Sequence, residues 1–221
     1  MVVARHSEDS PCTSVLRGLT LPSSGRSKGR FAPFGPPLMS NVRQHKHSVE
    51  LRTDLQNCVL RPWAASDKRN LARYANNSAV WRNLLDSFPH PYSEADAEFW
   101  IAHTQANPGL HFAIQLDGAA VGGIGIIPQS GLALQTAHFG YWLGQCVWGQ
   151  GIATAAARSM ASYAFQAFPF ARLEAPVFAW NPASMRVLEK AGFSREGVLR
   201  HSVFKDGQLI DSVLYARLRV V

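Results

Sequence analysis

The sequence predicts one α/β domain whose sheet is mixed but mostly antiparallel, and three observations carry this prediction. Short apolar segments and helical patterns alternate from about residue 50 to the C-terminus. Two Asp-Gly pairs lie between apolar segments, which is typical of β-hairpin turns. The chain of 221 residues, 47% of them hydrophobic, suffices for one domain of ordinary size with some residues to spare.

The first half of the domain is expected to begin with a strand and two helices. The apolar segment 58–63 predicts the strand, and Ser66-Asp67 then opens a helix that reaches Tyr74. Ser93 with Asp96 three residues later is a capping-box pattern, which predicts the second helix. Strands at 111–116 and 119–127 flank Asp117-Gly118 and form a hairpin, and a third antiparallel strand follows at 136–144.

The second half alternates helices and strands. Apolar residues recur at helical spacing between Ile152 and Tyr163, and a strand is expected at 172–180. Asn181-Pro182 is an N-cap followed by proline at the first helical position, and Gly192 ends that helix. A last hairpin turns at Asp206-Gly207 and returns to residue 218. These elements amount to six to seven strands flanked by about four helices.

Residues 1–49 predict no fold. The first 38 contain five Pro, four Gly and six Ser without a helical or alternating apolar pattern, so little apolar surface offsets the entropy of ordering. We interpret the segment as a disordered basic leader, or as the product of a start codon assigned too early, with Met39 as the candidate true start. A transit peptide is the third alternative, and only Glu8-Asp9 speak against it. The domain is expected to occupy residues 50–221.

Composition and charge exclude several classes of protein. The longest apolar run, 119–127, is far shorter than the roughly 18 residues that span a bilayer, and no apolar segment follows Arg5 as a secretory signal would require. Three distant cysteines without zinc spacing favour a reducing compartment, the cytoplasm, and no metal. The formal net charge is +7, but Lys and Arg form no stripe, so no nucleic-acid partner is expected.

The most informative stretch runs from residue 147 to 154 and reads VWGQGIAT. Its glycines let successive backbone N–H groups point at one spot, and the helix that begins here adds the partial positive charge of its N-terminus. Such a nest suits a phosphate or pyrophosphate. No Gly-Lys-Ser/Thr follows, which excludes a P-loop, and Thr154 stands where a dinucleotide fingerprint needs Gly or Ala. A glycine-rich turn that binds nothing is the alternative.

Further motifs complete a pattern with this loop. They are Gly140-Tyr141-Trp142-Leu143-Gly144 before it, and Asn181-Pro182-Ala183-Ser184, Val187-Leu188-Glu189-Lys190-Ala191-Gly192-Phe193 and Arg195-Glu196-Gly197-Val198-Leu199-Arg200 after it. Together these motifs resemble the GCN5-related N-acetyltransferases (GNAT), in particular the RimJ/RimL-type ribosomal-protein-alanine acetyltransferases. The resemblance covers about residue 50 to the C-terminus and is dense from Ala137 to Leu214.

The resemblance implies the GNAT fold, with acyl-CoA bound at a splayed pair of strands and acetyl-CoA as co-substrate. It implies that the pyrophosphate lies on the backbone amides of Gly149 to Thr154, and that the pantetheine arm runs along Tyr141 to Leu143 and is hydrogen-bonded to Asn181. The expected acyl-CoA-binding residues are Tyr141, Trp142, Leu143, Trp148, Gly149, Gln150, Gly151, Ile152, Ala153, Thr154 and Asn181. In one alternative, the Tyr141 side chain points outwards and only packs.

Acetyl transfer from a thioester to an amine needs a base, an oxyanion donor and an acid for the leaving thiolate. A backbone N–H near Leu143 is the expected oxyanion donor. Related proteins often hold Glu where His138 stands, and an imidazole can take the proton directly or through water; a strand histidine without a catalytic role is the alternative. Leu188 replaces the tyrosine that many members carry as acid, so Ser184 becomes the candidate acid, unless its hydroxyl serves only the backbone.

We therefore expect an N-acetyltransferase that moves acetyl to a primary amine by direct attack, with a protein N-terminus as the acceptor. A small amine such as a polyamine, an amino acid or an aminoglycoside is the alternative acceptor. A non-catalytic acyl-CoA-binding sensor is the alternative from another class. A monomer or a homodimer is expected, with acetyl-CoA and the amine as its partners.

Overall fold

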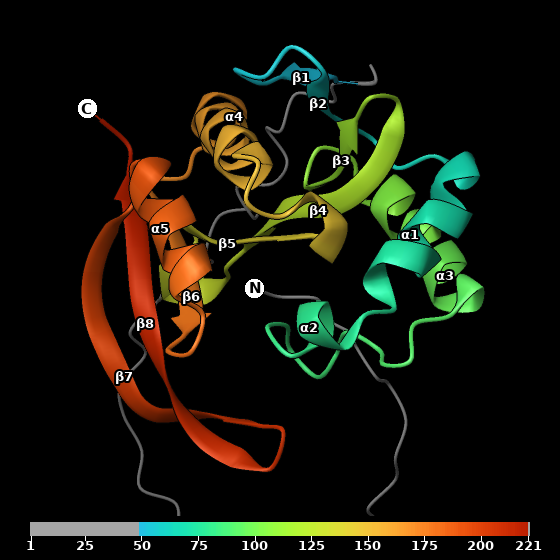
Figure 1. Ribbon diagram of the computed structural model, residues 1–221. Coiled ribbons are helices and arrows are strands. Elements are labelled where there is room, and N and C mark those ends of the chain that lie inside the picture. The colour runs from blue at the N-terminus through green and yellow to red at the C-terminus, as the bar shows by residue number, and fades with distance from the viewer. Residues whose placement is uncertain (1–48, 221) are drawn as a thin grey trace, which may run out of the picture. The chain divides into compact units, whose positions relative to one another are not determined.

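The computed structural model describes residues 49–220, and the leader expected at residues 1–49 lies outside the described residues except for its last one. Within the described chain, eight strands form one sheet in the order β1-β2-β3-β4-β5-β6-β8-β7 (Figure 1). The strands are β1 (Leu51–Arg52), β2 (Cys58–Arg61), β3 (His111–Leu116), β4 (Ala119–Pro128), β5 (Thr136–Leu143), β6 (Arg172–Phe178), β7 (Ser194–Lys205) and β8 (Gln208–Leu218).

Neighbouring strands are antiparallel except β5 and β6, which are parallel. The mixed, mostly antiparallel sheet predicted from the sequence is thus confirmed. The described chain has one strand more than the six to seven expected, because Leu51–Arg52 pairs with Val59 and Leu60 of β2. A strand of two residues is too short to show an alternating pattern, so it can be recognised only from its pairing with β2.

Five α-helices lie in the same residues, one more than expected. They are α1 (Lys68–Ala75), α2 (Ser78–Trp81), α3 (Glu94–Ala106), α4 (Ile152–Ala167) and α5 (Pro182–Lys190). The unexpected helix is α2, a single turn whose N-cap Asn77 accepts hydrogen bonds from the N–H groups of Ala79 and Val80. The capping box of Ser93 and Asp96 at the start of α3 is present as predicted.

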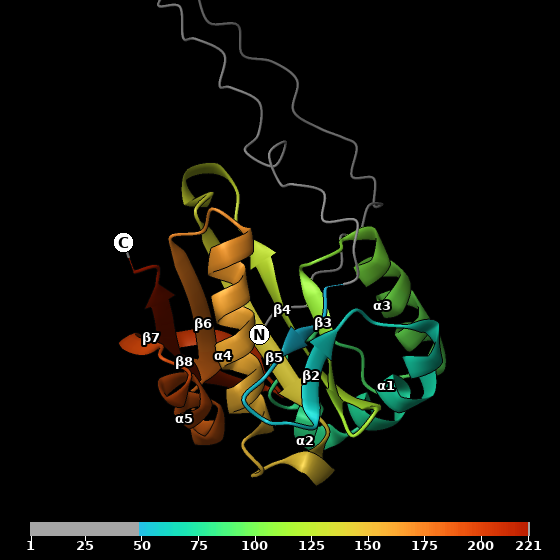
Figure 2. The ribbon, with the colours of Figure 1, turned by 90° about the horizontal axis from the view of Figure 1, so that it is seen from above.

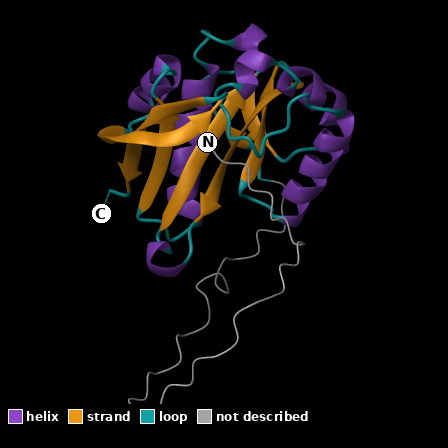
Figure 3. Ribbon diagram, turned by 90° about the horizontal axis from the view of Figure 1, so that it is seen from below, coloured by secondary structure: helices purple, strands orange, loops and turns teal. Residues whose placement is uncertain are grey.

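The helices cover both faces of the sheet (Figures 2 and 3). α4 and α5 share one core with inward residues of the strands, such as Phe112, Ile114 and Phe139. α1, α2 and α3 form a second core that includes the strand residues Ala113 and Ala120. Since successive strand side chains point to opposite faces, β3 and β4 contribute to both cores. The site described below is therefore bordered by α4 and α5 on one face of the sheet and by the α2 region on the other.

Both predicted Asp-Gly turns are confirmed. Asp117 and Gly118 join β3 to β4 with φ of 48° and 84°, and Asp206 and Gly207 join β7 to β8 with φ of 53° and 72°. Positive φ at both central positions is the geometry that two-residue hairpins favour. A third glycine, Gly122, lets β5 approach β4 closely, because a Cβ at this position would collide with the Trp142 carbonyl oxygen.

The hairpin of β7 and β8 reaches across to the segment between α2 and α3 (Figure 1). Close to its turn, the Lys205 Nζ donates to the Asp86 Oδ1 at 2.5 Å and lies 3.6 Å from the centre of the Trp81 ring. The Lys205 side chain is only 1% exposed. The cation–π contact therefore fastens the hairpin to the end of α2, and the ion pair fastens it to Asp86 in the segment that follows, 119 residues away in the sequence.

Candidate active site

Strands β5 and β6 are paired only over their first residues. Their parallel register joins residues 136–138 to residues 172–174. β5 then continues to Leu143 and β6 to Phe178 with no ladder between them. The two strands therefore separate inside the sheet, as the resemblance implies, and the backbone along the gap lacks its usual partners.

The backbone of β5 directs two free N–H groups into this gap. The Gly144 N–H donates to the Val121 carbonyl of β4 at 2.8 Å. Because N–H groups of successive strand residues point to opposite sides, the N–H groups of Leu143 and Tyr141 point away from β4. The Leu143 carbonyl shares that direction and accepts a hydrogen bond from the Trp148 Nε1 at 2.9 Å. The gap thus contains donors that can bind an extended ligand or an oxyanion.

The start of α4 supplies a second set of donors. Gly149 and Gly151 have φ of 78° and 80°, and Gly151 is the N-cap of the helix. The first helical bond runs from the Ala155 N–H to the Gly151 carbonyl, so the N–H groups of Ile152 to Thr154 have no helical partner. A Cβ at either glycine would meet nothing within 4 Å. This arrangement is an open nest of the kind that binds phosphate groups.

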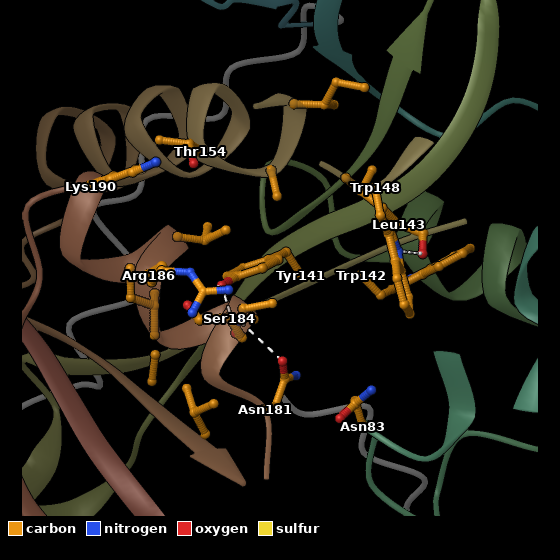
Figure 4. Close-up of a pocket in the computed structure, with 18 of the residues that line it drawn as sticks. Asn83, Tyr141, Trp142, Leu143, Trp148, Thr154, Asn181, Ser184, Arg186 and Lys190 are labelled. Carbon is orange, nitrogen blue, oxygen red and sulfur yellow. Dashed lines mark hydrogen bonds between the residues drawn. The ribbon is translucent and has the colours of Figure 1, made fainter. Parts of the chain in front are cut away.

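The strand gap and the nest open into one cleft of about 350 Å³ (Figure 4). All eleven residues expected to bind acyl-CoA line it, and so does Ser184. The residues that sequence reasoning did not single out include Val80, Asn83, Leu84, Arg186 and Lys190. Arg186 and Lys190 are four residues apart on α5 and therefore lie on one face of the helix, a spacing that could have revealed them. Nothing in the sequence around Asn83 indicates its place in the cleft.

Tyr141 and Ser184 form a hydroxyl pair across the cleft. The Tyr141 hydroxyl lies 2.7 Å from the Ser184 Oγ, and it donates to the Ser184 carbonyl at 3.1 Å. Burial raises the pKa of Tyr141, an effect that the hydrogen bond to Ser184 partly offsets, so the phenol stays protonated at neutral pH. The side chain of Tyr141 therefore points into the cleft, and the alternative in which it points outwards is wrong.

Asn181 is the N-cap of α5, as its sequence position predicts. Its Oδ1 accepts a hydrogen bond from the Ser184 N–H at 3.1 Å, drawn as a dashed line in Figure 4. The amide oxygen is therefore engaged in the cap, which leaves the Nδ2 group of Asn181 to face a ligand. The cap also fixes the first turn of α5, and with it the position of Ser184.

His138 lies outside the residues that line the cleft. It is the last residue of β5 that pairs with β6, and its Nε2 lies 2.9 Å from the Glu174 Oε1 of β6. Arg172 donates to the same carboxylate, at 3.1 Å from Oε2. By the alternation of a strand, His138 shares its face of the sheet with Trp142, and Gly140 between them carries no side chain.

Among residues 49–220, no three His, Cys, Asp or Glu side chains come close enough to hold a metal ion. The helices of this part of the chain are also too short or too polar to cross a membrane.

A family model described as an acetyltransferase (GNAT) domain matches residues 57–194, more than half of the chain. The chain therefore belongs to the GNAT acetyltransferase family, and the family resemblance seen in the sequence is confirmed.

Two named relatives illustrate the range of the family. The chain is 41% identical over 110 residues to "Probable N-acetyltransferase YjcK" of Bacillus subtilis, which covers 49% of this chain and 61% of that protein. It is 28% identical over 154 residues to spermidine N(1)-acetyltransferase of Escherichia coli, which covers 70% of this chain and 82% of that protein. The matched part spans less than two thirds of YjcK, and 47% and 45% of two other Bacillus N-acetyltransferases, p20 and YoaA.

Solved structures give the same fold. RimJ of Mycobacterium smegmatis, solved in complex with CoA-disulfide, is similar with a TM-score of 0.66 and 28% identity, over 77% of this chain and 86% of that one. An acetyltransferase of Bacillus anthracis has a TM-score of 0.67 at 21% identity, over 77% and 98% of the two chains. The expected GNAT fold is confirmed.

Proposed function

We propose that the protein is an N-acetyltransferase that moves acetyl from acetyl-CoA to a primary amine, and that this amine is a protein N-terminus. One observation carries the proposal: the splayed β5–β6 pair and the glycine-capped start of α4 open into the same cleft. The gap between the strands offers backbone donors to an extended arm, and the start of α4 offers backbone donors to a phosphate. A ligand with both parts, such as acyl-CoA, satisfies both sets.

The residues of the cleft fit acetyl-CoA. The N–H groups of Ile152 to Thr154 would hold the pyrophosphate, where the absence of a Cβ at Gly151 leaves room for it. The cleft also contains Arg186 and Lys190, whose charges suit phosphate groups (Figure 4). The Tyr141 N–H would donate to an amide carbonyl of the arm in place of a neighbouring strand.

The catalytic roles follow from the same geometry. The Leu143 N–H would donate to the oxyanion that develops on the thioester carbonyl. Ser184, held by the cap of α5 and by Tyr141, would give a proton to the departing thiolate. We propose His138 as the base that takes the amine proton through water, because it lies on the Trp142 face of β5 and the Gly140 between them has no side chain.

The resemblance of the sequence motifs to the RimJ/RimL-type ribosomal-protein-alanine acetyltransferases supports a protein N-terminus as acceptor. The similarity to spermidine N(1)-acetyltransferase supports a polyamine. The cleft favours the first, because none of its lining residues is Asp or Glu and a polycation would find no carboxylate there. The alternative of an acyl-CoA-binding sensor needs only the binding half of the site.

We also propose a monomer or homodimer. We place the protein in the cytoplasm, since the exposed thiol of Cys146 suits a reducing compartment.

Thiol release from acetyl-CoA tests the proposal. The full chain is incubated with acetyl-CoA and, in turn, a peptide with a free N-terminus, the same peptide with its N-terminus blocked, spermidine and an aminoglycoside. We expect release with the free peptide and not with the blocked one. Release only with a small amine would replace the acceptor, whereas acetyl-CoA binding without release for any amine would favour the sensor and overturn the proposal.

A further inference from the structure

The cleft has an acceptor side, which lies on the sheet face that carries Trp142. Its walls are the segment after α2, from which Asn83 lines the cleft, and the loop after β6, from which Asn181 lines it. Figure 4 shows Asn83 and Asn181 on the same side of the pocket. We call this region, with Arg82 and Trp180 at its edge, the acceptor entrance. Under the proposed function the amine would enter here, because Asn83 and Asn181 lie on the side of the pocket away from Thr154 (Figure 4).

A guanidinium spans the two walls of the acceptor entrance. Arg82 is the residue before Asn83, Trp180 is the residue before Asn181, and the Arg82 guanidinium carbon lies 4.7 Å from the centre of the Trp180 ring. The Nε1 of Trp180 is buried without a hydrogen-bond partner in the described part of the chain. Arg82 is exposed, and among residues 49–220 no carboxylate pairs with it. Its charge therefore remains available to a ligand.

The acids near this guanidinium are already engaged. Asp86 is the only acid between α2 and α3, and the buried ammonium of Lys205 holds it at 2.5 Å. Asp211 follows on β8, where its backbone carbonyl accepts the Ala179 N–H and its carboxylate accepts the His201 N–H at 2.8 Å. The lining of the cleft contains no Asp or Glu. At the acceptor entrance, the Arg82 guanidinium is therefore a cation that no carboxylate of the described chain neutralises.

We infer that the acceptor entrance selects an amine whose chain carries a carboxylate within a few residues, that is, the N-terminus of an acidic polypeptide, and that it disfavours polycations. This inference rests on the proposed function. Arg82, already oriented by the Trp180 ring, can form a bidentate pair with an Asp or Glu side chain at the second or third position of the acceptor. A polyamine would instead bring its remaining ammonium groups next to Arg82 with no carboxylate to receive them. Arg82 is thus a specificity-determining residue.

Three peptides that differ only in charge test the inference. They begin with the same free serine and continue with two Glu, two Ala or two Lys, and spermidine is the fourth acceptor. Thiol release gives kcat/KM, and peptide binding to the protein saturated with CoA gives a readout that does not require turnover. The variants are Arg82→Gln, Arg82→Glu and, as a matched control, Arg69→Gln, which removes the same charge from an exposed position on α1.

We expect the Glu peptide to exceed the Ala peptide by about three- to tenfold in kcat/KM, and the Lys peptide and spermidine to rank last. The preference should disappear in Arg82→Gln, reverse in Arg82→Glu, persist in Arg69→Gln and shrink in 1 M salt. Equal kcat/KM and equal binding for the three peptides would overturn the inference and leave N-terminal acetylation intact. Absence of both turnover and peptide binding would overturn the proposed function, and the inference with it.

Discussion

The nest at the start of α4 can be tested with a single methyl group. Gly151 has φ of 80°, and a Cβ on it would enter the space in which we propose that the pyrophosphate binds. Gly118, in the turn between β3 and β4, is a matched control because its φ is 84° and a Cβ would also meet nothing within 4 Å. The two alanine variants therefore share their backbone strain and differ only in their distance from the cleft.

The expected magnitudes follow from this pairing. An L-residue in the left-handed region costs about 1–2 kcal/mol relative to glycine. A domain of this size loses about 2–4 °C in Tm for each kcal/mol, so both variants should melt roughly 2–8 °C below the native protein without ligand. Acetyl-CoA at a hundred times its Kd adds about 2.7 kcal/mol, which raises the Tm by roughly 5–11 °C.

Thermal unfolding with and without acetyl-CoA is the assay. Gly118→Ala should keep the full rise in Tm, Gly151→Ala should keep only part of it, and Gly151→Trp should show none, because its side chain fills the nest. If Gly151→Trp keeps the rise of the native protein, the ligand does not bind at the start of α4 and the site assignment fails. If Gly118→Ala also loses the rise, the effect comes from strain and not from the nest.

Four further outcomes are expected. His138→Ala should lower kcat by roughly a hundredfold with acetyl-CoA binding intact, and His138→Glu should restore part of it; near-native turnover of the alanine variant would assign the histidine a purely structural role. Ser184→Ala should lower kcat by a similar factor while the rise in Tm with acetyl-CoA persists, and an unchanged kcat in steady-state thiol release would exclude it as the acid. Burial, with a smaller effect of nearby His103, lowers the pKa of His111 to about 4. Since this pKa is about 6.5 in the unfolded chain, the contribution of His111 to the free energy of unfolding is complete above pH 6.5 and falls by up to ~3 kcal/mol as the pH drops towards 4. Urea unfolding of native and His111→Gln proteins at the two pH values would measure this loss. A chain that starts at Met39 should keep the Tm and the acetyl-CoA response of the full chain in the same thermal assay, and a loss of either would show that the leader contributes to the fold.

Local chemistry explains what the sequence could predict. The turns at Asp117-Gly118 and Asp206-Gly207, the capping box of Ser93 and the cap at Asn181 each depend on residues within four positions of one another. For the same reason, the glycine loop could be placed at a helix start before any fold was known. The residues of the cleft were expected from the family resemblance, and the structure brings them together because the motifs lie at the ends of β5 and β6, which are neighbours in the sheet.

The features that escaped prediction depend on distant partners. β1 is defined by its pairing with β2, and the hydroxyl pair of Tyr141 and Ser184 joins residues 43 positions apart. The contact of Lys205 with Asp86 spans 119 positions, and the stack of Arg82 on Trp180 joins two segments with no shared pattern. In α2, Asn77 was a readable cap, but one turn is too short for helical periodicity.

The short ladder between β5 and β6 has a consequence for how the protein opens. In the described chain, three residue pairs are all that join the block β1–β5 to the block β6–β8 through the sheet. Packing of α4 against α5, the hydroxyl pair of Tyr141 and Ser184 and the contact of Lys205 with Asp86 hold the rest of this seam. The two blocks are therefore natural units of partial unfolding. A bound pantetheine arm that accepts hydrogen bonds from the free N–H groups of β5 and contacts α5 would connect the two blocks. Amide hydrogen exchange along β6 and α5 should then slow on ligand binding, so that the ligand completes the cooperative unit as a missing strand would.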